Sequence, residues 1–195
     1  MGDEMTRVRR SDAVENRSRL LASARALFAR DGLEVPMREI ARDARVGPAT
    51  LYRHFPTKQH LATEAFTAEM QACRAVVDDG LADPSPWRGL CRVIEQLSVL
   101  HARNLGFTEA FLATFPDAVD LATERRAALD AVAELARRAR ADGDLRHDFS
   151  PQDLVLTLMA TRGLDALPEA ARASASRRLA ALVIDGLRSP GRASA

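Results

Sequence analysis

The stretch that decides the fold is Pro36–Lys58, which reads PMREIARDARVGPATLYRHFPTK. Its first part, residues 36–44, repeats apolar residues at helical spacing and predicts a short helix with one buried face. A tight turn follows. A second helix is expected from Gly47, with Pro48 at the first helical position, where the missing N–H of proline costs nothing. Pro56 stops this helix. The stretch therefore predicts two short helices joined by a turn.

The second of these helices is predicted to have two different faces. Leu51 and Phe55 are four residues apart and should point into a core. The opposite side carries polar side chains, namely Thr50, Arg53 and His54, with Tyr52 at its edge. A short helix that presents such side chains outward is typical of DNA-reading helices.

The segment before this stretch is predicted to support it. Residues 1–10 show no apolar period, so we expect a mobile basic arm whose arginines either reach DNA or stay solvated. A helix is expected from Ser11 or Asp12, because Asp12 and Glu15 have the spacing of a capping box. Gly32 provides the left-handed end of this helix.

Beyond the stretch the apolar pattern remains helical. Thr57 is expected to cap a helix that begins at Lys58, and two apolar stripes make this helix a connector between domains. Further helices are predicted from Ser85–Pro86, over Thr108–Phe115 and Asp117–Asp142, from Ser150–Pro151, and within Glu169–Leu187. The prediction is an all-α protein of about nine helices, with domains at residues 1–57 and 58–195.

The composition narrows the class of protein. Hydrophobic residues make up 47% and charged residues 28% of the 195-residue chain, which is ordinary for a folded protein. Residues 1–60 carry 12 basic and 8 acidic side chains, whereas the remainder carries 16 and 19, so the front of the chain favours a polyanion. Without a long apolar run or a secretory signal, a cytoplasmic location and no membrane contact are expected.

The sequence carries no enzyme motif. Cys73 and Cys91 have no metal-binding spacing, the four histidines are scattered, and no glycine-rich phosphate loop occurs. We therefore expect no catalytic residue, no metal site and no cofactor.

Residues 40–58 resemble the tetracycline-repressor (TetR) family of one-component transcriptional regulators. Phe28 and Gly32 match the family's Phe-x-x-x-Gly end of the first helix, and its Leu-Tyr-x-His-Phe run with a following lysine is complete at residues 51–58. The resemblance is specific over Leu20–Leu61. Farther on it lies in the number of helices and in the run DLRHDFSPQDLVL, which is similar to the start of the eighth helix in many members.

Two residues depart from the family pattern. Pro36 stands where a Thr or Ser usually precedes the second helix, and it has neither a hydroxyl to cap the helix nor an N–H for Glu39. This change is expected to cost about 1 kcal/mol. Arg45 stands where the turn usually has glycine. If this position has φ > 0, Arg45 carries about 1 kcal/mol of strain. Arg45 is alternatively expected to add a phosphate contact.

The predicted DNA-binding residues are Arg38, Arg45, Gly47, Pro48, Ala49, Thr50, Tyr52, Arg53, His54 and Lys58. The resemblance implies DNA contacts at four of them: Thr50, Tyr52, His54 and Lys58. Arg38 and Arg53 are expected to read base edges, because arginine is the common partner of guanine. Pro48 and Ala49 are small enough to touch a thymine methyl group. The alternative makes Tyr52 and Phe55 core aromatics and leaves Arg53, His54 and Lys58 as a solvated face.

The resemblance also implies a homodimer and an effector site. The helix predicted from Ser150–Pro151 and the one within Glu169–Leu187 would pair between two copies through Leu154, Leu158, Leu179, Leu182 and Val183. An effector, largely apolar, would lie among the helices from the one that begins at Lys58 to the one that begins at Ser150–Pro151. It would contact Phe66, Met70, Trp87, Cys91, Ile94, His101, Phe107, Phe111, Phe115 and Met159. In the alternative, both sets only close the core of one chain.

These observations predict a ligand-responsive transcriptional regulator. It is expected to act as a repressor that binds a palindromic DNA operator as a dimer and leaves it when an effector binds. The alternative is a helical ligand-binding or scaffold protein with a degraded DNA-reading surface, which the departures at Pro36 and Arg45 keep open.

Overall fold

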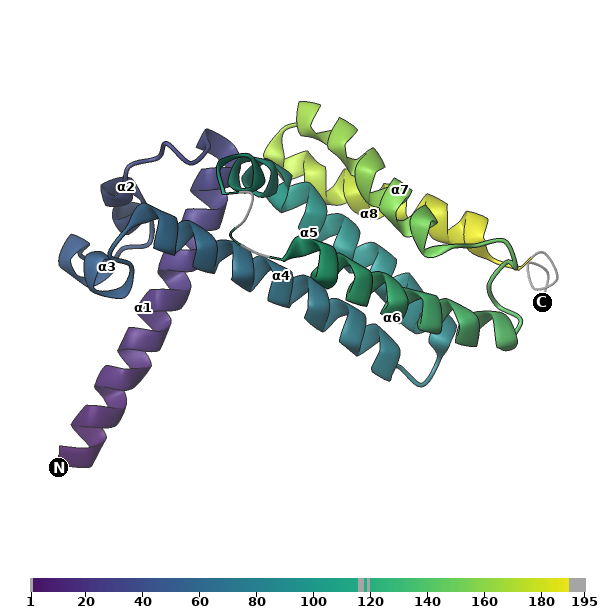
Figure 1. The fold of residues 1–195 in the computed structure, drawn as a ribbon, viewed down its shortest axis with the longest axis horizontal. Helices are drawn as coiled ribbons and strands as arrows, with labels where there is room; N and C mark the ends of the chain where they lie inside the picture. Colours follow the sequence, from purple (N-terminus) through teal and green to yellow (C-terminus); the bar gives the residue numbers. More distant parts are fainter. Residues whose placement is uncertain (1, 116–117, 119, 190–195) are drawn as a thin grey trace. The chain divides into compact units, whose positions relative to one another are not determined.

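The computed structural model describes residues 2–115, 118 and 120–189, and its regular structure is helical (Figure 1). In chain order the elements are α1 (Gly2–Asp31), α2 (Met37–Asp43), α3 (Pro48–His54), α4 (Lys58–Ala82), α5 (Pro86–Thr114), α6 (Leu121–Ala141), α7 (Pro151–Ala160), the 3₁₀ helix η1 (Thr161–Ala166) and α8 (Glu169–Leu187). The predicted all-α fold is confirmed. None of the helices described has a stretch that is long and apolar enough to cross a membrane.

The chain forms two compact units. The first consists of Met1–Glu69 and Gly106–Ala118, and the second of Met70–Leu105 and Val119–Ala195. Helices α4 and α5 therefore contribute residues to both units. The domain boundary between residues 57 and 58 stays a prediction, because the first unit also takes in the start of α4 and the end of α5.

Aromatic rings form the core of the first unit. Phe28 of α1 stacks on Phe107 of α5 with a centroid distance of 5.5 Å, and Phe66 of α4 stacks on Phe111 of α5 at 4.3 Å. All four rings are fully buried. Helices α1, α2 and α3 pack against one another beside this core. The core thus holds the two short helices of the stretch Pro36–Lys58.

The second unit has an aliphatic core drawn from five helices. Its fully buried residues include Leu90 and Ile94 of α5 and Leu135 of α6. At one point α4 and α5 approach backbone to backbone, because a Cβ atom on Gly89 would lie 2.2 Å from the carbonyl oxygen of Gly80. Two glycines therefore permit the close approach of α4 and α5.

Two predicted helix boundaries were wrong. α1 begins at Gly2 and not at Ser11 or Asp12, since Glu, Met and Arg are good helix formers and no breaker follows Gly2. The short helix predicted over Thr108–Phe115 is the end of α5. The helix predicted over Asp117–Asp142 corresponds to α6, which begins at Leu121. The position predicted for its start, Asp117, lies outside the described residues.

Gly106 explains why α5 continues. A Cβ atom at this position would lie 2.5 Å from the carbonyl oxygen of Ala29 in α1. Glycine weakens an isolated helix, but here it allows α5 to approach the backbone of α1. Packing thus stabilises a helix that the local sequence does not indicate.

The predicted helix ends are confirmed at several other positions. Gly32 and Gly143 both have φ 77° in the left-handed region. The Ser150 N–H donates to Asp153 Oδ2 at 2.7 Å as part of a capping box, and Pro151 follows at the first position of α7. Thr57 Oγ1 accepts a hydrogen bond from the His60 N–H at 3.1 Å, which caps α4 as predicted.

Candidate nucleic-acid interface

Both ends of α2 are unusual. Pro36 precedes the helix with φ −65° and ψ 141°, and it provides no side-chain cap. After the helix, the Val46 N–H donates to the Ala41 carbonyl at 2.9 Å and the Arg45 N–H to the Arg42 carbonyl at 3.1 Å. These two bonds form a Schellman motif, whose left-handed position is held by Arg45 with φ 54°. Strain at Arg45 was predicted on the condition that its φ is positive. The structure meets this condition.

The seven-residue helix α3 has the two faces that its sequence predicts. Leu51 and Phe55 are fully buried, whereas Tyr52 is 52% exposed. The Phe55 N–H donates to the Leu51 carbonyl at 2.8 Å and closes the helix. Tyr52 is thus a surface residue, and only Phe55 is a core aromatic.

All ten predicted DNA-binding residues lie in the first unit and reach its surface. The exposed members are Arg38, Arg45, Gly47, Pro48, Ala49, Tyr52 and Arg53, and the half-buried members are Thr50, His54 and Lys58. Their contact with DNA stays a prediction.

Four basic side chains of this surface are available for an anion. Within the part of the chain that the structure describes, Arg38, Arg45, Arg53 and Lys58 make no ion pair and no side-chain hydrogen bond. A lysine or arginine side chain without an acidic partner can bind a DNA phosphate without first breaking an ion pair.

His54 differs from these four residues. Burial lowers the pKa of His54, and the charges of Arg53 and Arg17 lower this pKa further. Its Nε2 atom is buried and has no hydrogen-bond partner among the described residues. A neutral imidazole offers an N–H donor and no charge, so His54 attracts a phosphate group less than its basic neighbours do.

The predicted dimer residues occupy different environments in the second unit. Leu154 is buried in its core, and Leu158 and Val183 pack against that core. Leu179 is half-buried, and Leu182 is 53% exposed. Two further apolar side chains of α7, Leu156 and Met159, are 62% and 52% exposed. Leu156 was not predicted for any site, and Met159 was predicted for the effector site.

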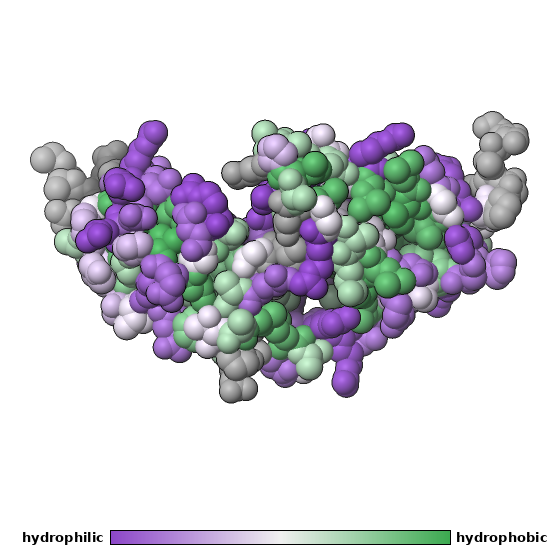
Figure 2. Space-filling view, turned by 90° about the horizontal axis from the view of Figure 1, so that it is seen from above, coloured by the Kyte–Doolittle hydropathy of each residue, from purple (hydrophilic) through white to green (hydrophobic). Residues whose placement is uncertain are grey.

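Hydrophobic residues appear among hydrophilic ones on the face of the second unit that Figure 2 shows. The large exposed apolar side chains of α7 and α8 are Leu156, Met159 and Leu182. The spacing of Leu156 and Met159 could have shown that α7 has a second apolar face, because they stand three residues apart on the side of α7 opposite Leu154.

The ten predicted effector residues divide between the two units. Phe66, Phe107, Phe111 and Phe115 belong to the first unit, where their rings pack against one another. Met70, Trp87, Cys91, Ile94, His101 and Met159 belong to the second. Trp87 and Ile94 are buried there, and Met159 is exposed. Burial raises the pKa of the Cys91 thiol to about 11, which makes this thiol a poor nucleophile near neutral pH.

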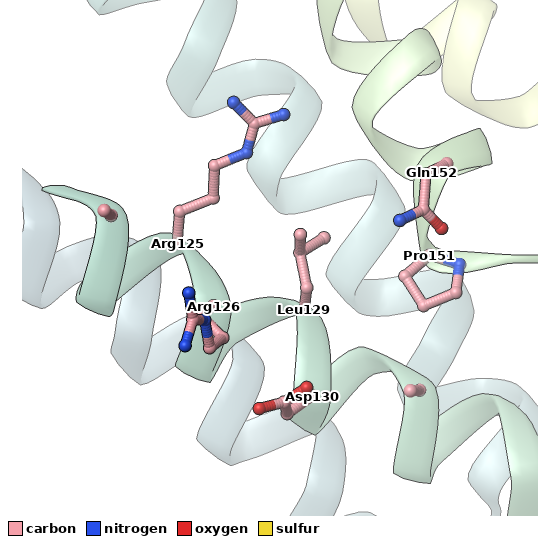
Figure 3. A pocket seen from close by; sticks show the side chains of 8 residues that line it. Arg125, Arg126, Leu129, Asp130, Pro151 and Gln152 are labelled. Carbon is pink, nitrogen blue, oxygen red and sulfur yellow. The ribbon is translucent and has the colours of Figure 1, made fainter.

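The second unit has a surface groove of about 430 Å³ between α6 and the start of α7. Its lining consists of Ala122, Arg125, Arg126, Leu129, Asp130, Ala133, Pro151 and Gln152. In Figure 3, Arg125 and Leu129 rise from α6 toward the side on which Pro151 and Gln152 begin α7. None of the predicted effector residues belongs to this lining. Among the residues described, no group of three or more His, Cys, Asp or Glu side chains is placed to hold a metal ion.

Comparison with protein families gives two matches that follow each other along the chain. Residues 20–65 match the family described as bacterial regulatory proteins, tetR family. Residues 85–189 match the C-terminal domain described as transcriptional regulator SbtR-like. The first match covers the end of α1, all of α2 and α3 and the start of α4, and the second covers α5 to α8.

Individual proteins resemble the chain over different lengths. The HTH-type transcriptional repressor KstR from Mycobacterium tuberculosis is 33% identical over 138 residues, which are 69% of this chain and 62% of that protein. The chain spans about half to three fifths of the length of such curated relatives.

Solved structures match over nearly their whole length. The TetR transcriptional regulator SCO0520 from Streptomyces coelicolor aligns with a TM-score of 0.71 and 30% identity, covering 89% of this chain and 99% of that one. A TetR transcription regulatory protein from Mycobacterium vanbaalenii aligns with a TM-score of 0.64 and 32% identity, covering 92% and 98%.

Proposed function

Because the chain belongs to the TetR family of bacterial regulatory proteins, we propose that it is a transcriptional regulator that binds a palindromic DNA operator as a homodimer. The observation that carries this proposal is α3, which buries Leu51 and Phe55 and turns Tyr52 and Arg53 outward. A helix of this kind enters the major groove, while flanking basic groups bind phosphates.

The repressor role and the effector are parts of the same proposal. The relative KstR is described as a transcriptional repressor, and this supports repression as the default output of the chain. A small molecule that binds the second unit would release the DNA. A protein with this task works in the cytoplasm, where the chromosome lies.

Each outward residue has a proposed role. Arg53 of α3 and Arg38 of α2 read base edges, and Tyr52 and Thr50 donate hydroxyl groups to phosphate or base. Lys58 and Arg45 bind phosphates. Gly47, Pro48 and Ala49 let the start of α3 approach the groove closely. His54, neutral and half-buried, makes at most a short-range hydrogen bond.

The test begins with a selection of bound sequences from fragmented genomic DNA. We expect an enriched palindrome whose half-sites lie about one helical turn, roughly 34–36 Å, or a multiple of this apart. Lys58→Ala should weaken binding to this palindrome and lower the salt dependence by about one unit of slope for each phosphate that is no longer bound. Tyr52→Ala should weaken operator binding more than binding to random DNA.

Arg126→Ala is the matched control. Arg126 is an exposed arginine of the second unit, and it makes no ion pair within the described residues. We expect wild-type affinity from this variant. The absence of an enriched palindrome, or equal binding by Tyr52→Ala, Lys58→Ala and wild type, would indicate the scaffold alternative.

We propose that the dimer forms through α7 and α8. Leu156, Met159 and Leu182 supply exposed apolar surface there, next to the half-buried Leu158, Leu179 and Val183. The double change Leu156→Glu with Leu182→Glu should convert dimers to monomers in analytical ultracentrifugation. Val14→Glu is the control, because Val14 is 67% exposed on α1 of the first unit. Unchanged dimers in the double variant would place the interface elsewhere.

We propose the effector site among the helices of the second unit, with Trp87, Cys91 and Ile94 on one stripe of α5. Ser98 lies one turn beyond Ile94, is fully buried, and its hydroxyl has no hydrogen-bond partner among the described residues. Such a hydroxyl is costly to bury alone and suits a polar group on an otherwise apolar ligand.

The site can be tested once a screen finds a small molecule that releases the protein from the selected palindrome. Ile94→Ala should then raise the concentration needed for release by about tenfold, as expected when a large apolar side chain is removed from the site. Leu129→Ala in the groove of Figure 3 should leave this concentration unchanged. The opposite pattern would place the effector in the groove.

A further inference from the structure

Three helices of the first unit meet at the ring of Phe55, the residue that directly follows α3. Phe55 is fully buried, and its backbone leaves helical geometry with φ −134° and ψ 88°. Arg17 comes from α1, and His60 and Glu64 come from α4. None of these three residues belongs to the predicted DNA-binding surface.

The contacts around Phe55 form a closed circuit. The Cζ atom of Arg17 lies 5.5 Å from the centroid of the Phe55 ring, and the Arg17 guanidinium also pairs with Oε2 of Glu64. The other carboxylate oxygen of Glu64 lies 2.9 Å from Nε2 of His60. The His60 ring in turn meets Phe55 edge to face at a centroid distance of 5.8 Å and 66°. Each member of the circuit thus touches two others.

Arg17 also acts on α3 through its charge. The largest cause of the lowered pKa of His54 is the burial of its imidazole ring. The charges of Arg53 and Arg17 lower this pKa further. The Arg17 charge therefore lies close to the last residue of α3 as well as to Phe55.

We propose that Arg17, His60 and Glu64 form a clamp that positions α3 on the first unit, and that they do so without contacting DNA. We call these three residues the Phe55 clamp. A helix of seven residues has few internal hydrogen bonds, so its orientation depends on what holds its ends. At the end of α3, the Arg17 guanidinium of α1 lies over the Phe55 ring and also pairs with Glu64 of α4.

The obvious competing role for Arg17 is a phosphate contact. Its guanidinium is already paired with Glu64 and stacked over Phe55, whereas Arg38, Arg45, Arg53 and Lys58 have no such partners within the described residues. If Arg17 had to leave Glu64 before it could bind a phosphate, breaking this ion pair would lower the affinity for DNA. The geometry therefore favours a role of Arg17 in positioning α3.

The clamp can be tested in the free protein by amide hydrogen exchange. In Arg17→Gln and Glu64→Gln, the Phe55 amide should exchange about threefold faster, the effect expected for one partly exposed ion pair. The amides of α2 should keep their rates. Arg19→Gln is the control, because among the described residues Arg19 bonds only to Asn16 on its own helix. Equal acceleration throughout α1 to α3, or no acceleration at Phe55, would overturn the proposal.

A second test uses DNA and rests on the proposed operator binding. On the selected palindrome, Arg17→Gln should lower affinity about threefold to tenfold, with an unchanged salt slope and unchanged binding to a random duplex. Arg17→Gln combined with Glu64→Gln should be no weaker than the worse single variant, because both changes open one circuit. A salt slope reduced by about one, or additive losses, would assign Arg17 to a phosphate.

The two tests fail in different ways. If no palindrome is recovered with the wild-type protein, the proposed operator binding is wrong, while hydrogen exchange at Phe55 still decides whether the clamp exists. If the palindrome is bound and exchange at Phe55 does not change, the clamp is wrong and the operator function stands.

Discussion

Helix α2 and the connection between α6 and α7 need the same backbone geometry and meet it with different residues. At the end of α6, the Gly143 N–H donates to the Arg140 carbonyl at 2.9 Å and the Asp144 N–H to the Ala139 carbonyl at 3.1 Å. The equivalent two bonds end α2. The left-handed residue is Gly143 with φ 77° in one case and Arg45 with φ 54° in the other.

The helix starts show the same contrast. α7 begins with a capping box, in which Asp153 accepts a hydrogen bond from the Ser150 N–H. α2 begins after Pro36, which has no side-chain hydrogen bond to offer and no N–H to satisfy. The α6–α7 connection therefore has preferred residues at both ends, and α2 has them at neither. Helix α2 is held by the burial of Met37, Ile40 and Ala41.

This difference indicates where the sequence serves something other than stability. A glycine at position 45 and a serine at position 36 would each relieve a local cost. On a DNA-facing surface, Arg45 offers a phosphate contact in return for backbone strain, whereas nothing in the structure explains Pro36.

Breaking the capping box of α7 should have the largest effect. Asp153→Ala leaves the half-buried Ser150 N–H without its acceptor and removes an anion from the first turn, so the free energy of unfolding should fall by about 1–2 kcal/mol. Urea denaturation measures the loss. Asp130→Ala on α6 is the control, because Asp130 is exposed and pairs with no described residue. An equal loss in both variants would mean that the box contributes nothing.

Placing an arginine at the end of α6 copies the geometry of α2 into the second unit. Gly143→Arg should lower the free energy of unfolding by about 1 kcal/mol, because an L side chain in the left-handed region is strained. Gly163→Arg is the control, since Gly163 has no positive φ and no atom within 4 Å of an added Cβ. If Gly143→Arg is neutral, Arg45 carries no strain either.

Giving α2 a cap should stabilise the first unit. Pro36→Ser supplies a hydroxyl acceptor and restores an N–H for Glu39, and it should raise the free energy of unfolding by about 0.5–1 kcal/mol. Pro36→Ala has the N–H but no hydroxyl and should gain little. Thermal unfolding of the three proteins compares them. Equal stability of the serine and alanine variants would show that the N-terminus of α2 needs no cap.

Local signals explain what was predictable in these two regions. Gly32, Gly143, Thr57 and the pair Ser150 and Asp153 each mark a helix end through their own backbone or side-chain chemistry, and the structure confirms them. At Arg45 the resemblance showed only that the position is usually glycine, so strain was predicted on the condition of a positive φ, which the structure has. The outward face of α3 followed from helical spacing and the proline stop.

The features that were missed depend on contacts between distant residues. The continuation of α5 through Gly106 requires the backbone of Ala29, which lies 77 positions earlier in the chain. Helix α7 has apolar residues on two faces, so spacing alone did not show that Leu154 points inward and Leu156 outward. The Phe55 clamp joins Arg17 to His60 and Glu64, and no local pattern links these residues.

The α6–α7 connection should also respond to acid. A hydrogen bond from Arg146 lowers the pKa of Asp148 to about 2. Because this folded-state pKa is below the ordinary value, the pair stabilises the protein above about pH 4, and this contribution is lost as the pH falls toward 2. Asp148→Asn should therefore flatten the decline in stability between pH 4 and 2. A decline as steep as that of the wild type would mean that Asp148 is not responsible.

The smallest change in stability is expected at Arg45, where the free energy of unfolding should rise and the affinity for DNA should fall. Arg45→Gly relieves the left-handed strain but makes the unfolded chain more flexible, so the free energy of unfolding should rise by only about 0.5 kcal/mol. Affinity for the selected palindrome should fall, with the salt slope reduced by about one for each phosphate that is no longer bound. Arg42→Gly provides the contrast, because Arg42 is an exposed residue inside α2. Glycine there should lower the free energy of unfolding, since it weakens the helix and relieves no left-handed strain. If Arg45→Gly binds the palindrome as tightly as wild type, Arg45 makes no DNA contact that would explain its strained backbone. The difference between α2 and the α6–α7 connection would then have no functional reason.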